Sequence, residues 1–227
     1  MTEVPVLTID GPSGSGKGTV SRAAAKALGW RLLDSGALYR LVALAARRAG
    51  IPLDEAAALA ELAERFDIAF DPGPAGEEIV RLGGQDVTRD IRTEQAGNDA
   101  SKVASLRQVR AALLERQRRF AVPPGLVADG RDMGTVVFPR APVKIFLTAS
   151  PEERALRRHK QLKEKGVAAT LAALSLEIAE RDRRDMTRSV SPLVASADAV
   201  VLDTTGMSVD AVVERVLGVV RGRLAPR

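Results

Sequence analysis

Short apolar runs alternate with longer amphipathic stretches along this chain. Five of the runs have the length of a buried strand and are too short for most helices, namely residues 4–10, 30–33, 126–128, 143–147 and 199–203. Stretches of helical period follow them. This alternation predicts an α/β fold in which a five-stranded parallel sheet with right-handed crossovers is flanked by helices.

The helical periods predict where the helices begin and end. Asp34 or Ser35, Asp54 and Ser208 are the expected N-caps. The basic residues after the last helix, 221–227, are expected to fray. The predicted helices cover residues 17–28, 35–49, 54–66, 93–102, 106–120, 152–165, 170–188 and 208–220.

One section departs from the α/β alternation. Residues 68–70, 78–82 and 85–87 are short strand candidates, and Gly83-Gly84 between the last two predicts a tight hairpin turn. Turn-forming residues precede them at Pro72, Gly73, Pro74 and Gly76. The section predicts a small antiparallel sheet inserted between α/β units, either a substrate-binding lobe or an insertion without function.

Length and composition indicate a soluble globular domain. The 227 residues suit one α/β domain with an inserted lobe, and 45% apolar with 28% charged residues excludes a disordered chain. No apolar run reaches the roughly 18 residues of a membrane span, and no signal peptide is indicated. The absence of cysteine excludes disulfides and thiolate metal sites, and it fits a reducing compartment. We therefore expect a cytoplasmic protein without a membrane partner.

The chain is basic, with a net charge of +5 and a pI near 9.9. Nucleic-acid binding is one interpretation of this charge. The five Phe, one Tyr and one Trp leave few platforms for base stacking, and the basic residues are scattered. Positive charge around a polyphosphate ligand, or the composition of the genome, explains the balance without a nucleic-acid partner.

A glycine-rich segment follows the first predicted strand and opens the first predicted helix. Glycines let the loop turn tightly and direct successive backbone N–H groups into one concavity, to which the helix adds its positive dipole end. Lys17 places a cation where the outer phosphates of a nucleotide would lie. The predicted phosphate-binding loop consists of Gly11, Pro12, Ser13, Gly14, Ser15, Gly16, Lys17, Gly18 and Thr19.

The loop departs from the common G-x-x-x-x-G-K-[ST] pattern at one position. Gly18 stands where a magnesium-side hydroxyl is expected, and the hydroxyl comes one residue later as Thr19. This G-K-G-T ending resembles the nucleoside monophosphate kinases rather than GTPases or motor ATPases. The alternative, a flexible Gly/Ser linker, does not account for the flanking strand and helix.

Two further positions suggest anionic ligands or their metal. Asp129 ends an apolar strand, where an acidic side chain can orient hydrated Mg²⁺, so Asp129 and Thr19 are the candidate metal-side residues. Ser35 and Arg40 lie at the start of a predicted helix, where both could meet an anion. A capped surface helix with an exposed arginine is the alternative for that pair.

Charged side chains recur on one face of the helix predicted over residues 170–188. Arg181, Arg184, Asp185 and Arg188 follow the i, i+3, i+4, i+7 spacing. A surface ion-pair ladder is one interpretation, but three arginines around one carboxylate leave excess positive charge for an anionic ligand. His159, the only histidine, has no expected catalytic role.

Four segments taken together closely resemble the bacterial cytidylate kinases. The D-S-G-A-x-Y-R and D-G-R-D-M-G-T sequences are the most specific of them, whereas the phosphate loop alone says little about the substrate. The similarity extends over essentially the whole chain, including the inserted lobe. The segments are residues 11–19, 33–40, 129–139 and 181–185.

The resemblance implies transfer of the γ-phosphoryl group from ATP to CMP or dCMP, with Mg²⁺ as cofactor. It implies one P-loop kinase domain over 1–227, with a nucleotide-acceptor region over 34–103 that includes the small sheet at about 67–88, and a helical lid with substrate-facing helices over 152–188. Arg154, Arg157 and Arg158 fall in the lid segment.

The same resemblance implies roles for individual residues. Residues 11–19 and Arg157 would bind ATP. The catalytic residues would be Lys17, Arg131, Arg158 and Arg181. The acceptor would be bound by Ser35, Arg40, Ser101, Arg110, Arg131, Asp132, Arg181, Asp185 and Arg188.

Three other functions remain open at this point. Another small-molecule kinase of the same fold would act on UMP, AMP or shikimate, although the D-G-R-D segment and the inserted sheet disfavour it. A nucleic-acid-stimulated ATPase would use the basic surface, and a silent nucleotide-binding module is disfavoured by the intact Lys17, Arg131 and Asp185. A monomer is expected, because neither a long heptad pattern nor an extended apolar patch is present.

Overall fold

The computed structural model describes residues 4–74, 78–164 and 166–225. Gly76, Lys165 and the last two residues of the predicted basic tail lie outside the described residues. The chain divides into two compact units. The first contains Met1–Asp34 and Arg118–Arg227, and the second is Ser35–Gln117.

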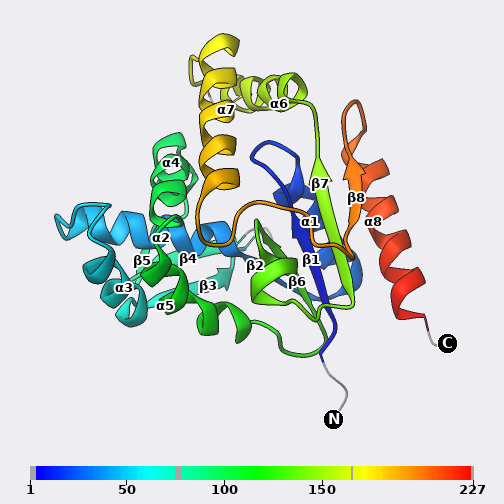
Figure 1. The fold of residues 1–227 in the computed structure, drawn as a ribbon, viewed down its shortest axis with the longest axis horizontal. Helices are drawn as coiled ribbons and strands as arrows, with labels where there is room; N and C mark the ends of the chain where they lie inside the picture. The colour runs from blue at the N-terminus through cyan, green and yellow to red at the C-terminus, as the bar shows by residue number, and fades with distance from the viewer. Residues whose placement is uncertain (1–3, 75–77, 165, 226–227) are drawn as a thin grey trace. The chain divides into compact units, whose positions relative to one another are not determined.

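The first unit is built on the predicted five-stranded parallel sheet, which is confirmed. Its strand order is β2-β6-β1-β7-β8, so the strand that precedes the glycine loop is central (Figure 1). The strands are β1 (Val6–Asp10), β2 (Arg31–Asp34), β6 (Leu126–Gly130), β7 (Val143–Thr148) and β8 (Val200–Asp203).

The register of the central strands brings their carboxyl ends to one edge. All five positions of β1 and of β6 are buried, as expected for parallel strands covered on both faces. Leu7 lies opposite Val127 on β6 and Val143 on β7, while Asp10 lies opposite Gly130. The loops that follow β1 and β6 therefore start side by side.

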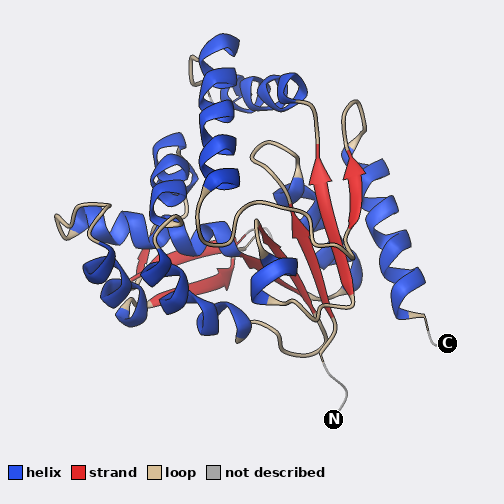
Figure 2. Cartoon of the chain, viewed as in Figure 1, coloured by secondary structure: helices blue, strands red, loops and turns tan. Residues whose placement is uncertain are grey.

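Two helices of the first unit, α1 (Lys17–Leu28) and α8 (Val209–Leu224), pack against each other and against the sheet (Figure 2). Their apolar faces and the sheet form one core. That core includes Leu7, Ile9, Val20, Ala24, Val127, Val143, Ile145, Leu147, Val212, Val216 and Val220.

The last helix is longer than its pattern predicts. The Ser208 hydroxyl caps its first turn, as expected, by accepting a hydrogen bond from the N–H of Ala211 at 3.2 Å. The prediction that the chain frays from residue 221 is wrong for residues 221–224, which are helical. Val220 and Leu224 pack against the core and extend the helix by one turn.

Two charged helices, α6 (Pro151–Glu164) and α7 (Leu171–Thr187), pack against each other. Thr170 caps α7 by accepting from the N–H of Ala173 at 3.2 Å. Between β6 and β7 the chain also forms one turn of π-helix, Met133–Val137, which no sequence pattern predicted. None of the described helices is both long and apolar enough to span a bilayer.

The second unit contains the predicted small sheet, with strand order β3-β4-β5 and antiparallel pairing. Gly83 and Gly84 form its hairpin turn with φ of +56° and +75°, values that suit glycine. The unit's elements are α2 (Ser35–Arg48), α3 (Ala56–Arg65), β3 (Ile68–Pro72), β4 (Glu78–Leu82), β5 (Gln85–Asp86), a 3₁₀ turn (Asp90–Arg92), α4 (Glu94–Val103) and α5 (Arg107–Arg118), whose last residue falls in the first unit.

One predicted helix cap of the second unit is wrong. Helix α3 starts from Glu55 rather than Asp54, and the Glu55 side chain makes no capping hydrogen bond among the described residues. The Glu55 N–H instead donates to the Pro52 carbonyl at 3.3 Å, and this turn moves the start of the helix by one residue.

Leu7→Ala should lower the free energy of unfolding of the protein by about 2–5 kcal/mol, because it opens a cavity at a fully buried position of the central strand. Urea denaturation followed by circular dichroism measures this loss. Val201→Ala on β8, where the side chain is 57% exposed, is the control and should change stability far less. Equal losses in the two variants would contradict the assignment of the core.

Candidate active site

The loop between β1 and α1 depends on residues without side chains. Gly11 has φ of +154°, and a Cβ there would lie 2.1 Å from the Leu147 carbonyl oxygen. Gly14 has φ of +77°, and its Cβ would lie 3.0 Å from the Cβ of Arg154. Any larger residue at either position would displace backbone. The glycines predicted from the sequence are thus required by the neighbouring strand β7 and helix α6.

The loop closes on itself around one backbone oxygen. The Ser15 hydroxyl and the Lys17 ammonium both donate to the Pro12 carbonyl at 3.0 Å. Helix α1 then starts from Gly16, whose left-handed conformation turns the chain into the helix. The first N–H groups of a helix have no partners within it, so this end of α1 is suited to an anion.

Lys17 lies among charges of both signs. Burial and the neighbouring guanidinium of Arg131 lower the pKa of Lys17, and Arg181 adds to this effect. The carboxylates of Asp129 and Asp185 act in the opposite direction. The positive charges outweigh the negative ones around the ammonium, and an anionic ligand would relieve their mutual repulsion.

Asp129 is buried at the end of β6, in the strand position predicted for it. Burial raises the pKa of Asp129, and the charge of Lys17 opposes the rise. A Cβ on Gly18 would lie 3.2 Å from Oδ2 of Asp129. A side chain at position 18 would therefore require Asp129 to shift by a few tenths of an ångström, and the glycine found there avoids this crowding.

The described residues contain no cluster of three or more His, Cys, Asp or Glu side chains able to hold a metal ion by themselves. Of the two candidate metal-side residues, Asp129 is buried and Thr19 is exposed. A single carboxylate and a hydroxyl fit an ion that arrives with a nucleotide, because Mg²⁺ in such sites takes most of its ligands from phosphate and water.

Arg131, which is half-buried, and Asp185, which is buried, form an ion pair in the first unit. The guanidinium Nε of Arg131 donates to Oδ2 of Asp185 at 3.0 Å, and its Nη1 donates to the Gly130 carbonyl at 3.2 Å. Burial alone would raise the pKa of Asp185, but the charges of Arg131, Arg181 and Arg188 outweigh it and hold the pKa below its usual value.

The predicted charged face of α7 is built around this carboxylate. Arg181 and Arg188 lie near enough to Asp185 to act on its ionisation. Arg184, from the same face, forms an ion pair with Glu180 at 3.0 Å one turn earlier on the helix. Arg188 donates to the Ser191 carbonyl, and the Leu193 N–H donates to the Asp185 carbonyl at 2.8 Å, so the segment after α7 folds back on it.

Asp132 is buried and stands at the start of the π-helical turn. A second buried acid, Asp10, accepts hydrogen bonds from the first two N–H groups of that turn, those of Met133 at 2.9 Å and Gly134 at 2.8 Å. Sequence analysis missed Asp10. Asp10 ends an apolar strand just as Asp129 does, and this pattern could have identified Asp10 as a candidate site residue.

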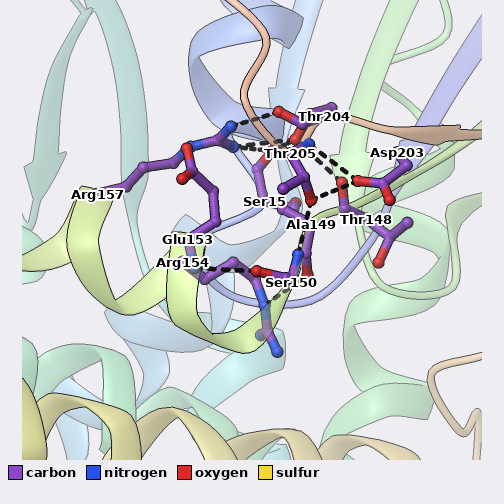
Figure 3. A network of polar contacts seen from close by, with 10 residues as sticks. All are labelled: Ser15, Thr148, Ala149, Ser150, Glu153, Arg154, Arg157, Asp203, Thr204 and Thr205. Carbon is purple, nitrogen blue, oxygen red and sulfur yellow. Dashed lines mark hydrogen bonds and ion pairs between the residues drawn. The ribbon is translucent and has the colours of Figure 1, made fainter.

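Arg154 on α6, drawn in Figure 3 beside Ala149 and Ser150, contacts the glycine loop. It donates to the Ala149 carbonyl at 3.2 Å and to the Ser13 carbonyl at 3.1 Å, and it pairs with Asp182 on α7 at 2.6 Å. Its side chain is buried. One arginine of the predicted lid segment thereby connects the glycine loop with both charged helices.

Arg157 lies one turn further along α6 and contacts a residue that sequence analysis missed. Its guanidinium donates to the hydroxyl of Thr204 at 2.9 Å and to the Thr204 carbonyl, and it pairs with Glu153 at 2.9 Å (Figure 3). The Thr204 hydroxyl also lies 3.2 Å from the Ser15 carbonyl. The loop after β8, α6 and the glycine loop therefore share one polar network.

The third arginine of this segment is placed differently. Arg158 donates to Gln161 on its own helix at 3.0 Å, at the surface. His159 follows it on α6 and is half-buried. Arg154 and Arg157 are thus bound to the glycine loop, while the recorded hydrogen bond of Arg158 is local to α6.

The second unit carries the remaining predicted acceptor residues on three helices. The Ser35 hydroxyl, at the first position of α2, donates to Gln117 at 2.8 Å. Arg110 on α5 is buried, donates to the Ala104 carbonyl at 3.1 Å and lies over the Tyr39 ring at 5.5 Å. The other two residues of this set are Arg40 on α2 and Ser101 on α4.

Each unit therefore gathers its own part of the predicted site. In the first unit the glycine loop, Asp129, Arg131 and the charged face of α7 act on one another electrostatically. In the second unit Ser35 and Gln117 link the start of α2 to the last turn of α5. The first unit can therefore bind a polyanion through a lysine, arginines and backbone N–H groups.

The chain is similar to known proteins over nearly its whole length. The family described as cytidylate kinase matches residues 7–222. The cytidylate kinase of Azotobacter vinelandii is 58% identical over 222 residues, covering 96% of each chain. That of Shewanella loihica is 54% identical over 220 residues, covering 97% of this chain and 96% of the relative.

A solved structure of an uncharacterized protein from Eubacterium ventriosum shares the fold. Its TM-score is 0.50 at 12% identity, over 96% of this chain and 99% of the other. The family match spans nearly the whole chain and includes the glycine loop, the segment of Arg131 and the charged face of α7. The chain belongs to the cytidylate kinase family.

Proposed function

We propose that this protein transfers the γ-phosphoryl group of ATP to CMP or dCMP, forming ADP and CDP or dCDP. The observation that carries the proposal is the cluster of Lys17, Arg131 and Arg181 beside the glycine loop, in which burial first and then the neighbouring guanidinium groups lower the pKa of the lysine. Such a cluster is unfavourable by itself and is stabilised by a polyanion. Family membership supports CMP as the acceptor.

The donor nucleotide would bind along the glycine loop. Backbone N–H groups of residues 11–19 would hold the phosphates, with Lys17 on the outer ones. Binding there would restore the charge of the Lys17 ammonium, because phosphate oxygens replace the surrounding guanidinium groups as its nearest charges. Arg157, beside Thr204 and the Ser15 carbonyl, would contact ATP from α6.

The residues that would recognise the acceptor are those implied by the resemblance to the cytidylate kinases. Ser35, Arg40 and Arg131 would bind its phosphate, since a guanidinium fork can hold two phosphate oxygens at once. Arg181 and Asp185 would reach the ribose. The cytosine base would be surrounded by Ser101, Arg110, Asp132 and Arg188.

The reaction needs positioning and charge stabilisation more than acid–base chemistry. The acceptor phosphate is already an anionic nucleophile, so no strong general base is required, and the residues gathered here are cations and backbone N–H groups rather than a catalytic triad. Arg131, Arg158 and Arg181 would stabilise charge on the transferred group, an effect of about 10³–10⁵ in rate in related enzymes.

A magnesium ion fits this site as a companion of ATP. Asp129 and Thr19 are the residues that would hold it, through water or directly, at the end of β6 and the first turn of α1. When bound, the ion supplies neutralisation of phosphate charge. The buried carboxylate of Asp129, which lies near the ammonium of Lys17, supports this proposed role.

The proposed substrates place the protein in pyrimidine nucleotide metabolism of the bacterial cytoplasm. We further propose that it acts as a monomer with ATP and CMP or dCMP as its partners. Light scattering of the purified protein measures its mass against the 24.1 kDa of one chain. A stable dimer would contradict the monomer.

An acceptor panel tests the function. ADP formation is measured with ATP, Mg²⁺ and one of CMP, dCMP, UMP, AMP or shikimate, and separately with DNA or RNA. We expect CMP and dCMP to give the largest kcat/KM, and nucleic acid to give none. A larger kcat/KM with another acceptor would reassign the substrate. Hydrolysis of ATP that is stimulated by nucleic acid and needs no acceptor would contradict the proposal that the protein is a phosphotransferase.

Lys17→Ala should lower kcat by about a hundredfold or more while the fold is kept, because the charge facing the transferred phosphoryl group is lost. Circular dichroism and the coupled ADP assay measure both. Lys26→Ala, an exposed lysine in the last turn of the same helix, is the matched control and should behave as wild type. Near-normal turnover of the Lys17 variant would refute the proposed role of Lys17 in the transfer. Arg131→Ala should lower kcat by a comparable factor.

Asp132→Ala should reduce discrimination between CMP and UMP, because a buried carboxylate that accepts from the cytosine amino group would be gone. The ratio of kcat/KM for the two acceptors measures this and should fall about tenfold. Asp54→Ala, at an exposed acid outside the proposed site, should leave the ratio unchanged. An unaltered ratio in the Asp132 variant would exclude this carboxylate from base recognition.

A further inference from the structure

Asp10 is a buried acid that the proposed transfer reaction does not use. It is the last residue of β1, immediately before the glycine loop, and its side chain is 5% exposed. Oδ1 accepts the N–H of Met133 at 2.9 Å and Oδ2 accepts the N–H of Gly134 at 2.8 Å. Both carboxylate oxygens are thus committed to one distant backbone turn.

That turn directly follows the residues assigned to the acceptor. The π-helical turn Met133–Val137 begins after Asp132, and the first N–H groups of a helix lack partners within it. Within the described part of the chain, the Asp132 side chain makes no capping hydrogen bond to this turn. Asp10 therefore supplies the cap of this turn from a distant strand.

The turn is also packed closely against β1. A Cβ on Gly134 would lie 2.9 Å from Oγ1 of Thr8 and 3.2 Å from Cδ of Lys144. In the sheet, Asp10 is opposite Gly130, the residue before Arg131. Contacts on both sides of Arg131 and Asp132 thereby connect these residues to the strand that begins the glycine loop.

The charge of this cap is unfavourable for stability. Burial raises the pKa of Asp10 to about 7, the N–H donors of Gly134 and Met133 oppose the rise, and the nearby carboxylates of Asp132 and Asp129 add to it. A neutral side chain could accept one of these hydrogen bonds without burying an acid among acids. Local violations of this kind are typical of functional sites.

We propose that Asp10 is a positioning residue for the acceptor: its carboxylate fixes the turn that presents Arg131 and Asp132 at a set place relative to the glycine loop. The inference rests on the proposed function in assigning those two residues to the acceptor. Donor and acceptor phosphates must come into line for transfer, and errors near 1 Å lower rates by about a hundredfold. Asp10 connects the glycine loop, which would bind the donor, with the segment of Arg131 and Asp132, which would bind the acceptor.

Asp10→Asn tests the proposal, because the amide has the same shape but sets an NH₂ group against one of the two backbone donors. The KM for the best acceptor of the wild-type protein should rise about 10- to 100-fold. The Kd for ATP, measured by calorimetry, should stay within about twofold, since the loop's own hydrogen bonds are kept. The melting temperature at pH 8 should stay within about 3 °C of wild type, because the variant removes an unfavourable buried charge.

Two companion variants separate positioning from folding. Asp54→Asn makes the same acid-to-amide change at an exposed position outside the proposed site, and it should leave both nucleotide constants unchanged. Gly134→Ala displaces the turn while Asp10 remains, and it should raise the acceptor KM as Asp10→Asn does.

The outcomes decide the proposal separately from the proposed function. If wild type prefers an acceptor other than CMP, the substrate assignment fails, and the Asp10 test proceeds with that acceptor. Wild-type kinetics in Asp10→Asn would overturn the positioning role. Equal weakening of ATP and acceptor binding, or failure of both Asp10→Asn and Gly134→Ala to fold, would assign the contact to folding alone and overturn it as well.

Discussion

The site depends on how closely the backbone after β1 approaches the end of β7. At Gly11 the chain passes so near the Leu147 carbonyl that no Cβ fits between them. This close approach accompanies the turn of the loop, from which α1 starts at the left-handed Gly16. The strand order places further site residues beside the loop. Because β6 pairs with β1, Asp129, Arg131 and Asp132 lie at the same edge of the sheet.

The electrostatics of the first unit follow from that placement. Cations from the loop, from the segment after β6 and from α7 converge, and only a few carboxylates offset them. Asp185 is held ionised by its arginine neighbours, whereas Lys17 is pushed toward its neutral form. These charged groups are in place before a ligand binds, and a pre-arranged set of charges spares an enzyme from reorganising around a polyanion during the reaction.

Local patterns predicted most of the fold but only part of the site. The strands, α1 and the small antiparallel sheet follow from residue periods and turn glycines, which act over a few neighbours. The contacts of Asp10, Arg154 and Thr204 join positions more than a hundred residues apart, so no local pattern reports them. The cap at Asp54 and the frayed tail failed for a related reason, since a preceding turn and core packing decided those helix ends.

The contact between Gly18 and Asp129 links two positions that are far apart in the sequence. The more widespread lysine–serine or lysine–threonine pair would put a Cβ 3.2 Å from a carboxylate oxygen, so Asp129 would have to retreat by a few tenths of an ångström. Any side chain introduced beside the lysine is therefore transmitted to the acid at the end of β6, and redesign of the loop has to treat the two residues as one unit.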